Sequence, residues 1–182
     1  MTKIIGLLKK VPAFKTKLFQ VFLLGLGFLL VMPVQAQHKP SRKDRQMQEY
    51  MTMVNLVSSR KFVYRATRAF PQSNNPQMLS SDYEVSLNDS IVSGYLPYVG
   101  NAYRNMDLSG SGFEFSDVCR NLVIESNNEK MVVSCSFVVE SKDHDQLIIS
   151  IESSGSNYAK LSINCNNKQP ISYRGGLSPL KK

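Results

Sequence analysis

The chain has 182 residues, of which 42% are hydrophobic and 20% charged, enough for one domain with a hydrophobic core, and this excludes disorder of the whole chain. Its formal net charge of +8 is uneven, because residues 1–36 contain five lysines and no acidic residue, whereas the remainder holds 17 basic and 14 acidic residues. A nucleic-acid partner is disfavoured, because there is no tryptophan and no basic stripe interleaved with aromatic residues.

Residues 1–36 have the pattern of a cleaved signal peptide. Lysines precede an apolar run whose uninterrupted core, residues 21–32, is shorter than the roughly 20 residues of a membrane-spanning helix. Pro33 breaks the run, and the residues before Ala36 predict cleavage between Ala36 and Gln37. We therefore expect an exported protein, periplasmic or secreted, with no stable membrane span after cleavage. An uncleaved membrane anchor is the alternative.

A helix is predicted near the start of the mature chain. Residues 37–45 are expected to form a flexible leader, and the apolar periodicity predicts a helix over residues 44–59. Its apolar residues recur at helical spacing: Met47, Tyr50, Met51, Val54 and Val57. Such a methionine-rich stripe is typical of core packing, and a partner-binding surface is the alternative.

After the helix the apolar pattern changes to a period of two, as in half-buried strands. The clearest alternation lies at residues 131–139, 147–151 and 159–165. We predict an α+β, mostly β fold, in which an N-terminal helix is followed by a curled antiparallel sheet of eight or nine strands, either an open barrel or sandwich-like. The domain is expected to span residues 46–176, with a disordered tail at 177–182.

Three cysteines, an odd number without a C-x-x-C pair, predict neither a zinc ribbon nor a redox motif. If Cys119 and Cys135 lie on the two arms of one hairpin, Cys135 faces roughly Leu122, and the offset along the strands exceeds the reach of a disulfide. Cys135 and Cys165 should be separated by another strand. We interpret all three as small core residues.

The longest predicted loop, residues 97–112, carries the candidate ligand-binding residues. Tyr95, Tyr98, Tyr103 and Arg104 cluster in or beside it. Tyrosines with an arginine form good contact surfaces, because they are rigid, amphipathic and able to donate hydrogen bonds. The alternative is that Tyr95 and Tyr98 plug the end of the barrel.

The usual residues of enzymatic or metal chemistry are sparse. His38 falls in the leader, and His144 lies in a predicted turn between two aspartates, where nothing holds the imidazole in a pocket and too few metal ligands converge. The chain contains no nucleotide-binding glycine motif. Three glutamates alternate with apolar positions and are expected to face solvent: Glu84, Glu114 and Glu152. We therefore predict no catalytic residue, no metal and no cofactor.

Residues 92–103, VSGYLPYVGNAY, resemble exported proteins of Bacteroidetes-type bacteria that form domain-of-unknown-function family 4251. Residues 59–71, 111–115 and 161–175 are similar to further stretches of that family, in the same order and spacing. The resemblance implies an envelope or secreted location in a Gram-negative bacterium. It implies no activity, ligand or catalytic residue. Val99 and Asn101 stand where bulkier or basic residues are expected in relatives.

Together these patterns favour a non-enzymatic periplasmic or secreted binding module for a small apolar ligand, with the segment from Tyr95 to Arg104 at the mouth of a curled sheet. An envelope structural or protein-interaction module is the second hypothesis, acting through the outer face or the basic helix. An enzyme is the third, and the missing bases disfavour it.

Protein recovered from the cell envelope is expected to lack residues 1–36, because cleavage after Ala36 leaves Gln37 at the N-terminus. Intact-mass measurement and N-terminal sequencing test this. Recovery of envelope protein with the lysine-rich segment still attached contradicts it.

Overall fold

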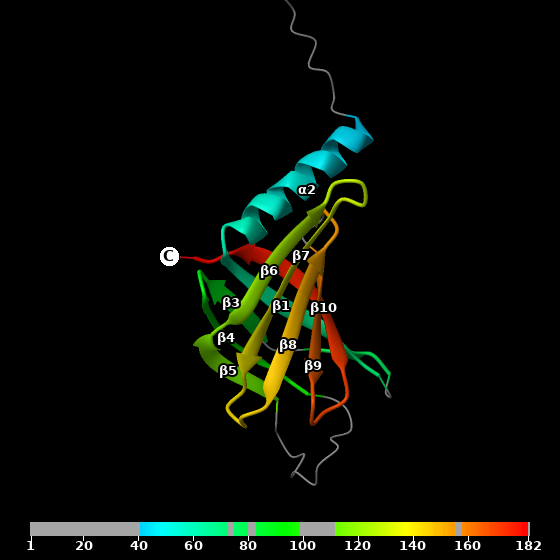
Figure 1. Ribbon diagram of the computed structural model, residues 1–182. Coiled ribbons are helices and arrows are strands. Elements are labelled where there is room, and N and C mark those ends of the chain that lie inside the picture. The colour runs from blue at the N-terminus through cyan, green and yellow to red at the C-terminus, as the bar shows by residue number, and fades with distance from the viewer. Residues whose placement is uncertain (1–40, 73–74, 80–82, 99–111, 156–157, 182) are drawn as a thin grey trace, which may run out of the picture. The chain divides into compact units, whose positions relative to one another are not determined.

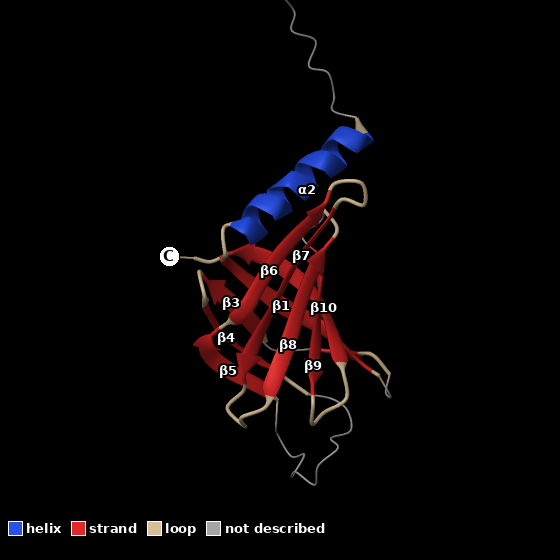
Figure 2. Ribbon diagram, in the orientation of Figure 1, coloured by secondary structure: helices blue, strands red, loops and turns tan. Residues whose placement is uncertain are grey.

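One helix precedes a run of antiparallel strands (Figures 1 and 2). The computed structural model describes residues 41–72, 75–79, 83–98, 112–155 and 158–181. The predicted signal peptide, its cleavage site between Ala36 and Gln37 and the first part of the leader lie outside the described residues. The elements are α2 (Arg42–Ser58), β1 (Lys61–Pro71), β2 (Gln77–Met78), β3 (Glu84–Asn88), β4 (Ile91–Leu96), β5 (Phe113–Val118), β6 (Arg120–Asn127), β7 (Val132–Glu140), β8 (Gln146–Ser153), β9 (Tyr158–Cys165) and β10 (Ile171–Pro179).

The strands form one sheet in the order β5-β4-β3-β1-β10-β9-β8-β7-β6, and the short β2 pairs with β1. All pairs are antiparallel, and β1 with β10 joins the first long strand to the last. The sheet curls until β5, at one end of the order, lies against β7, and the backbone N–H of Lys142, just after β7, donates to the carbonyl oxygen of Glu114 on β5 at 2.8 Å. The predicted mostly β fold with an N-terminal helix is confirmed, as a nearly closed antiparallel barrel.

The interior is filled by the side chains that alternation points inward. Along β7 the buried residues are Val133, Cys135, Phe137 and Val139, as the period of two predicts. The register then aligns the inward residues of neighbouring strands, so that Phe137 faces Ile149 on β8 and Ile149 faces Ile163 on β9. Aromatic side chains from β1, β5, β7 and β10 are at most 1% exposed: Phe62, Tyr64, Phe113, Phe115, Phe137 and Tyr173. Burial raises the pKa of the Tyr64 and Tyr173 hydroxyls well above the ordinary value.

Helix α2 begins earlier than predicted, which corrects the flexible leader at its C-terminal end. Ser41 and Asp44 form a capping box, in which the Ser41 Oγ accepts from the Asp44 N–H at 3.2 Å and the Asp44 Oδ2 accepts from the Ser41 N–H at 3.0 Å. This pair satisfies two backbone donors that would otherwise lack partners, so the helix starts at Arg42. No helix among the described residues is long and apolar enough to cross a membrane.

The helix packs against the sheet through its C-terminal half. Tyr50, Met53 and Val57 are buried, and α2 contacts β1, β6 and β7 (Figure 1). The Tyr50 hydroxyl donates to Oδ1 of Asn128 at 2.8 Å. The predicted apolar stripe is therefore correct only in part. Met47 and Met51 are 37% and 48% exposed, and the methionine that is buried against the sheet is Met53.

The C-terminal tail is also corrected. Strand β10 continues to Pro179, and Phe62 on β1 pairs with Pro179. Gly175 and Gly176, the last two residues of the predicted domain, lie inside this strand. A Cβ on Gly175 would lie 1.9 Å from the carbonyl oxygen of Arg65, at the point where the β1–β10 register shifts after Ala66. Glycine is needed here because the two backbones approach closely where the sheet bends.

Gly175→Ala is expected to lower the free energy of unfolding by about 3 kcal/mol, because the added methyl group meets backbone rather than a side chain that can move. Urea denaturation measures the change. Ser172→Ala, on the partly exposed face of the same strand, is the control and should stay within about 0.5 kcal/mol of the wild type. Equal stability of Gly175→Ala and the wild type would show that β1 and β10 lie further apart.

Candidate functional site

The two described residues of the predicted site have different neighbours. The Tyr95 ring, 41% exposed, lies against Tyr83 with 5.8 Å between ring centroids. The Tyr98 ring is half-buried and meets Phe113 edge-on, with centroids 5.4 Å apart. Tyr103 and Arg104 lie outside the described residues. The structure therefore does not bring Tyr95 and Tyr98 together as one contact surface.

Tyr98 instead forms part of a polar cluster around a buried lysine. Lys168 has a side chain only 2% exposed, and its Nζ lies 5.0 Å from the Phe113 ring centroid and 5.7 Å from that of Tyr98. The same Nζ is 3.7 Å from Oδ2 of Asp143 and 4.0 Å from Oδ2 of Asp145. Carboxylates and aromatic faces together stabilise an ammonium group that has lost its water.

Hydrogen bonds fix the chain around this cluster. The backbone N–H of Gln169 donates to the Tyr98 hydroxyl at 3.0 Å, and the Tyr173 hydroxyl donates to the carbonyl oxygen of Pro97 at 2.9 Å. Asn167 Nδ2 donates to Oδ1 of Asp145, whose side chain is 4% exposed. This cluster could not be predicted from the sequence, because a lysine in a turn is ordinarily exposed. Tyr98 thus acts as a support at the end of the barrel, the alternative that the sequence left open.

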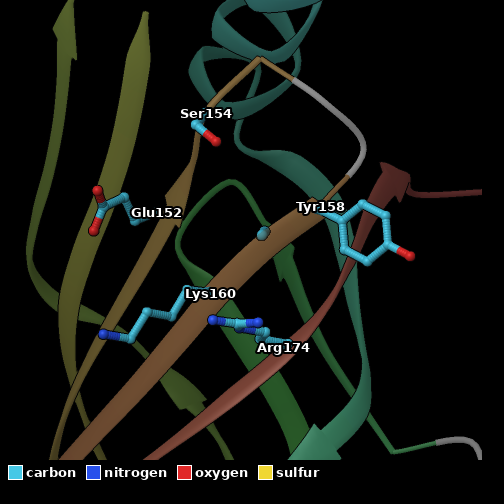
Figure 3. A pocket seen from close by; sticks show the side chains of 6 residues that line it. Glu152, Ser154, Tyr158, Lys160 and Arg174 are labelled. Carbon is cyan, nitrogen blue, oxygen red and sulfur yellow. The ribbon is translucent and has the colours of Figure 1, made fainter. Parts of the chain in front are cut away.

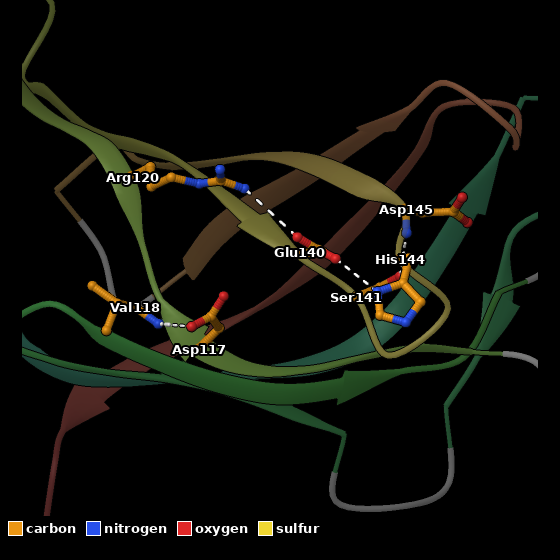
Figure 4. A network of polar contacts seen from close by, with 7 residues as sticks. All are labelled: Asp117, Val118, Arg120, Glu140, Ser141, His144 and Asp145. Carbon is orange, nitrogen blue, oxygen red and sulfur yellow. Dashed lines mark hydrogen bonds and ion pairs between the residues drawn. The ribbon is translucent and has the colours of Figure 1, made fainter.

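A second polar network lies on the surface near the β7–β8 turn (Figure 4). The Glu140 carboxylate is 2.8 Å from Nδ1 of His144 and 4.0 Å from Nη2 of Arg120. His144 is 88% exposed, so no pocket holds its imidazole, as expected for a turn residue. Among the described residues no group of three histidine, cysteine or carboxylate side chains is placed to hold a metal ion.

The carboxylates on the strands have the solvent-facing positions that alternation predicts. Glu84 pairs with Arg65 at 3.2 Å, and Glu114 pairs with Lys142. All four side chains are about half exposed, so solvent screens both pairs and each contributes little to stability.

The cysteines are unpaired thiols. Burial raises the pKa of Cys135 to about 12, with the nearby Cys119 adding to the shift, so Cys135 stays protonated and unreactive at neutral pH. Burial also raises the pKa of Cys119. Cys135 faces Ile124 rather than Leu122, because the turn between β6 and β7 pairs Asn127 with Val132 and this register continues unbroken to Cys135. The interpretation as small core residues is confirmed for Cys119 and Cys135, which are buried, whereas Cys165 is only partly buried, and the predicted register is wrong.

A groove on the outer face of the sheet has no counterpart in the sequence prediction (Figure 3). It has a volume of about 380 Å³ and lies over β8, β9 and β10. The residues that line it are Glu152, Ser154, Tyr158, Ala159, Lys160 and Arg174. Each polar member could be recognised as outward-facing from the alternation. Their grouping depends on the register between three strands, which periodicity alone does not fix.

These features define a small, nearly closed antiparallel barrel closed at one end by an N-terminal helix, with grooves on its outer surface. The family model DUF4251, a domain of unknown function, matches residues 44–177, and the chain belongs to this family. The crystal structure of a DUF4251 family protein from Bacteroides eggerthii DSM 20697 is similar, with a TM-score of 0.58 and 18% sequence identity, over 73% of this chain and 89% of that chain. At this identity the likeness shows the fold alone. No curated protein matches the chain.

Lys168→Met is expected to lower the free energy of unfolding by about 3 kcal/mol, because it leaves the buried Asp145 carboxylate without its cation. Lys142→Met is the matched control, since it breaks the exposed pair with Glu114 and should cost less than about 1 kcal/mol.

The double variant Lys168→Met/Asp145→Asn should recover part of the loss, because it also removes the buried negative charge. Chemical denaturation of the wild type, the single variants Lys168→Met and Asp145→Asn and the double variant measures the cycle. Equal losses for Lys168→Met and Lys142→Met contradict the structural role of the buried lysine.

Proposed function

We propose that this protein is an exported, non-enzymatic binding module that contacts its ligand or partner through the outer surface of the barrel. The observation that carries the proposal is the filled interior. Bulky inward residues of β3, β7, β8 and β9 are at most 1% exposed, including Leu87, Phe137, Ile149 and Leu161. Side chains with so little accessible surface leave an apolar ligand no volume between these strands.

The Tyr95–Tyr98 end supports the same conclusion. Tyr98 contacts Phe113 and Lys168 and accepts a hydrogen bond from Gln169, so its ring and hydroxyl contribute to closing the barrel. An apolar ligand that entered here would have to displace a buried ion-pair cluster. The outer grooves are open to solvent without any such rearrangement.

The non-enzymatic part of the proposal rests on the titratable groups of the described residues. The only described histidine is 88% exposed, and the carboxylates Glu84 and Glu114 are engaged with cations at the surface. General acid–base chemistry needs such groups at a site that holds a substrate. Export rests on the residue pattern of the N-terminal 36 residues alone.

Native mass spectrometry of the protein, expressed with its own N-terminal segment and recovered from the periplasm of a Gram-negative host, tests the proposal. The expected result is the mass of the polypeptide without a retained apolar molecule. Phe137→Ala is the positive control, because truncating this buried ring opens an apolar cavity that should take up benzene, whereas the wild type should not.

A stoichiometric apolar molecule carried by the wild type would overturn the outer-surface proposal in favour of a ligand inside the barrel. Uptake of benzene by the wild type to the same extent as by Phe137→Ala would do the same.

A further inference from the structure

Three cations lie side by side on the outer face of the barrel. The register pairs Lys160 on β9 with Arg174 on β10, and Arg174 with Arg68 on β1. All three are exposed, and directly opposite residues on neighbouring strands have Cβ atoms about 5 Å apart. Glu152 on β8 occupies the next place in the same row, opposite Lys160. The row therefore carries one acidic and three basic side chains.

This arrangement is electrostatically unfavourable in the protein alone. Like charges directly opposite each other on a sheet destabilise it. Elsewhere on the barrel, cations of the strands are paired, as Arg65 is with Glu84 at 3.2 Å. Among the described residues no carboxylate lies within 4.0 Å of the Lys160 or Arg174 side chains. The Arg174 guanidinium instead lies 4.9 Å from the centroid of the Phe70 ring.

The cations line a groove that also has an aromatic wall and a hydroxyl. Figure 3 shows Lys160 between Glu152 and Arg174, with the Tyr158 ring on the other side of the groove. Tyr158 is 72% exposed. The register pairs it with Gly176 on β10. Ser154 adds a hydroxyl group to the lining.

Serines continue the polar surface next to the groove. On the row beside the cations, the register aligns serines from four neighbouring strands: Ser136, Ser150, Ser162 and Ser172. All four are partly exposed on the outer face. The face therefore offers donors and acceptors to a ligand longer than the groove itself.

From this juxtaposition we propose that the groove over β8, β9 and β10 binds an acidic sugar, that is, a hydroxyl-rich ligand carrying a carboxylate or phosphate group. The guanidinium of Arg174 matches the planar geometry of such an anion, and Lys160 adds a second charge. The Tyr158 ring packs against the apolar face of the sugar, while Ser154 and Glu152 bond its hydroxyls. This inference rests on the proposed function and names the ligand class for the outer surface.

Isothermal titration calorimetry of the mature protein with trigalacturonate at low ionic strength tests the inference, with maltotriose as the neutral control sugar. Trigalacturonate is expected to bind and maltotriose is not. Arg174→Gln and Lys160→Gln should each weaken binding about tenfold or more, because each removes a charged contact. Lys130→Gln, the same charge change at an exposed turn residue on another part of the barrel, should leave the affinity unchanged.

Inorganic phosphate separates the two sources of the anion. Competition by phosphate at concentrations where equal ionic strength of sodium chloride has no effect assigns the groove to a phosphate-bearing sugar. If galacturonate competes and phosphate does not, the groove binds a carboxylate-bearing sugar. Both results support the acidic-sugar class.

Thermal unfolding without ligand gives an independent readout. Lys160→Gln should leave the melting temperature unchanged or higher at low salt, because it relieves like-charge repulsion. A clear loss of stability instead assigns Lys160 a structural role and contradicts the inference. This variant also keeps the test decisive if Arg174→Gln does not fold.

Absence of binding of both trigalacturonate and phosphate to the folded wild type overturns the inference, as do equal affinities of Arg174→Gln and Lys130→Gln. The outer-surface part of the proposed function is tested separately, because it is overturned by an apolar molecule inside the barrel and not by the absence of sugar binding.

Discussion

The pairing of β1 with β10 is the constraint on which the rest of the structure depends. It joins the first long strand to the last one, and every other strand extends the sheet outward from this pair. The pairing requires the backbones to approach so closely that Gly175 has no room for a Cβ beside Arg65. At this bend the sheet curls, and curling brings β5 near β7 and encloses the inward side chains. The same bend sets the register that aligns Arg68 with Arg174 on the outside.

Closure separates the two faces of the sheet into different roles. The inner face is packed with aromatic and aliphatic side chains, and helix α2 adds Tyr50, Met53 and Val57 to it. At the end near Tyr98, Lys168 is 2% exposed and lies between aromatic rings and carboxylates, so this end also has a structural role. The outer face is therefore the surface that is left for binding. There, basic side chains outnumber the acidic ones in the row across β8, β9, β10 and β1. The proposed module is therefore a rigid scaffold that presents one polar face.

The sequence alone predicted the inward-facing side chains correctly where a local hydrophobic period determines them. Alternation over β7, β8 and β9 identified the inward residues, because side chains of a strand alternate strictly between faces. It was insufficient where position depends on partners distant in the chain. The capping box at Ser41 lengthened the helix, and the pairing of Asn127 with Val132 at the β6–β7 turn placed Cys135 opposite Ile124. The groove around Lys160 depends on the two registers that join β8, β9 and β10, so single-strand periodicity does not reveal it.

The pairing of the first long strand with the last also determines when the barrel can close as the chain is synthesised. Strand β1 has β3 available soon after it, but its other edge stays unsatisfied until β10, about a hundred residues later, has emerged. Until β10 pairs with β1, the two parts of the sheet are not joined, and the inward-facing side chains are not enclosed. We therefore expect the barrel to close only after β10 has been made. Such a delay is compatible with the proposed export, because a polypeptide passes through a translocation channel before it folds.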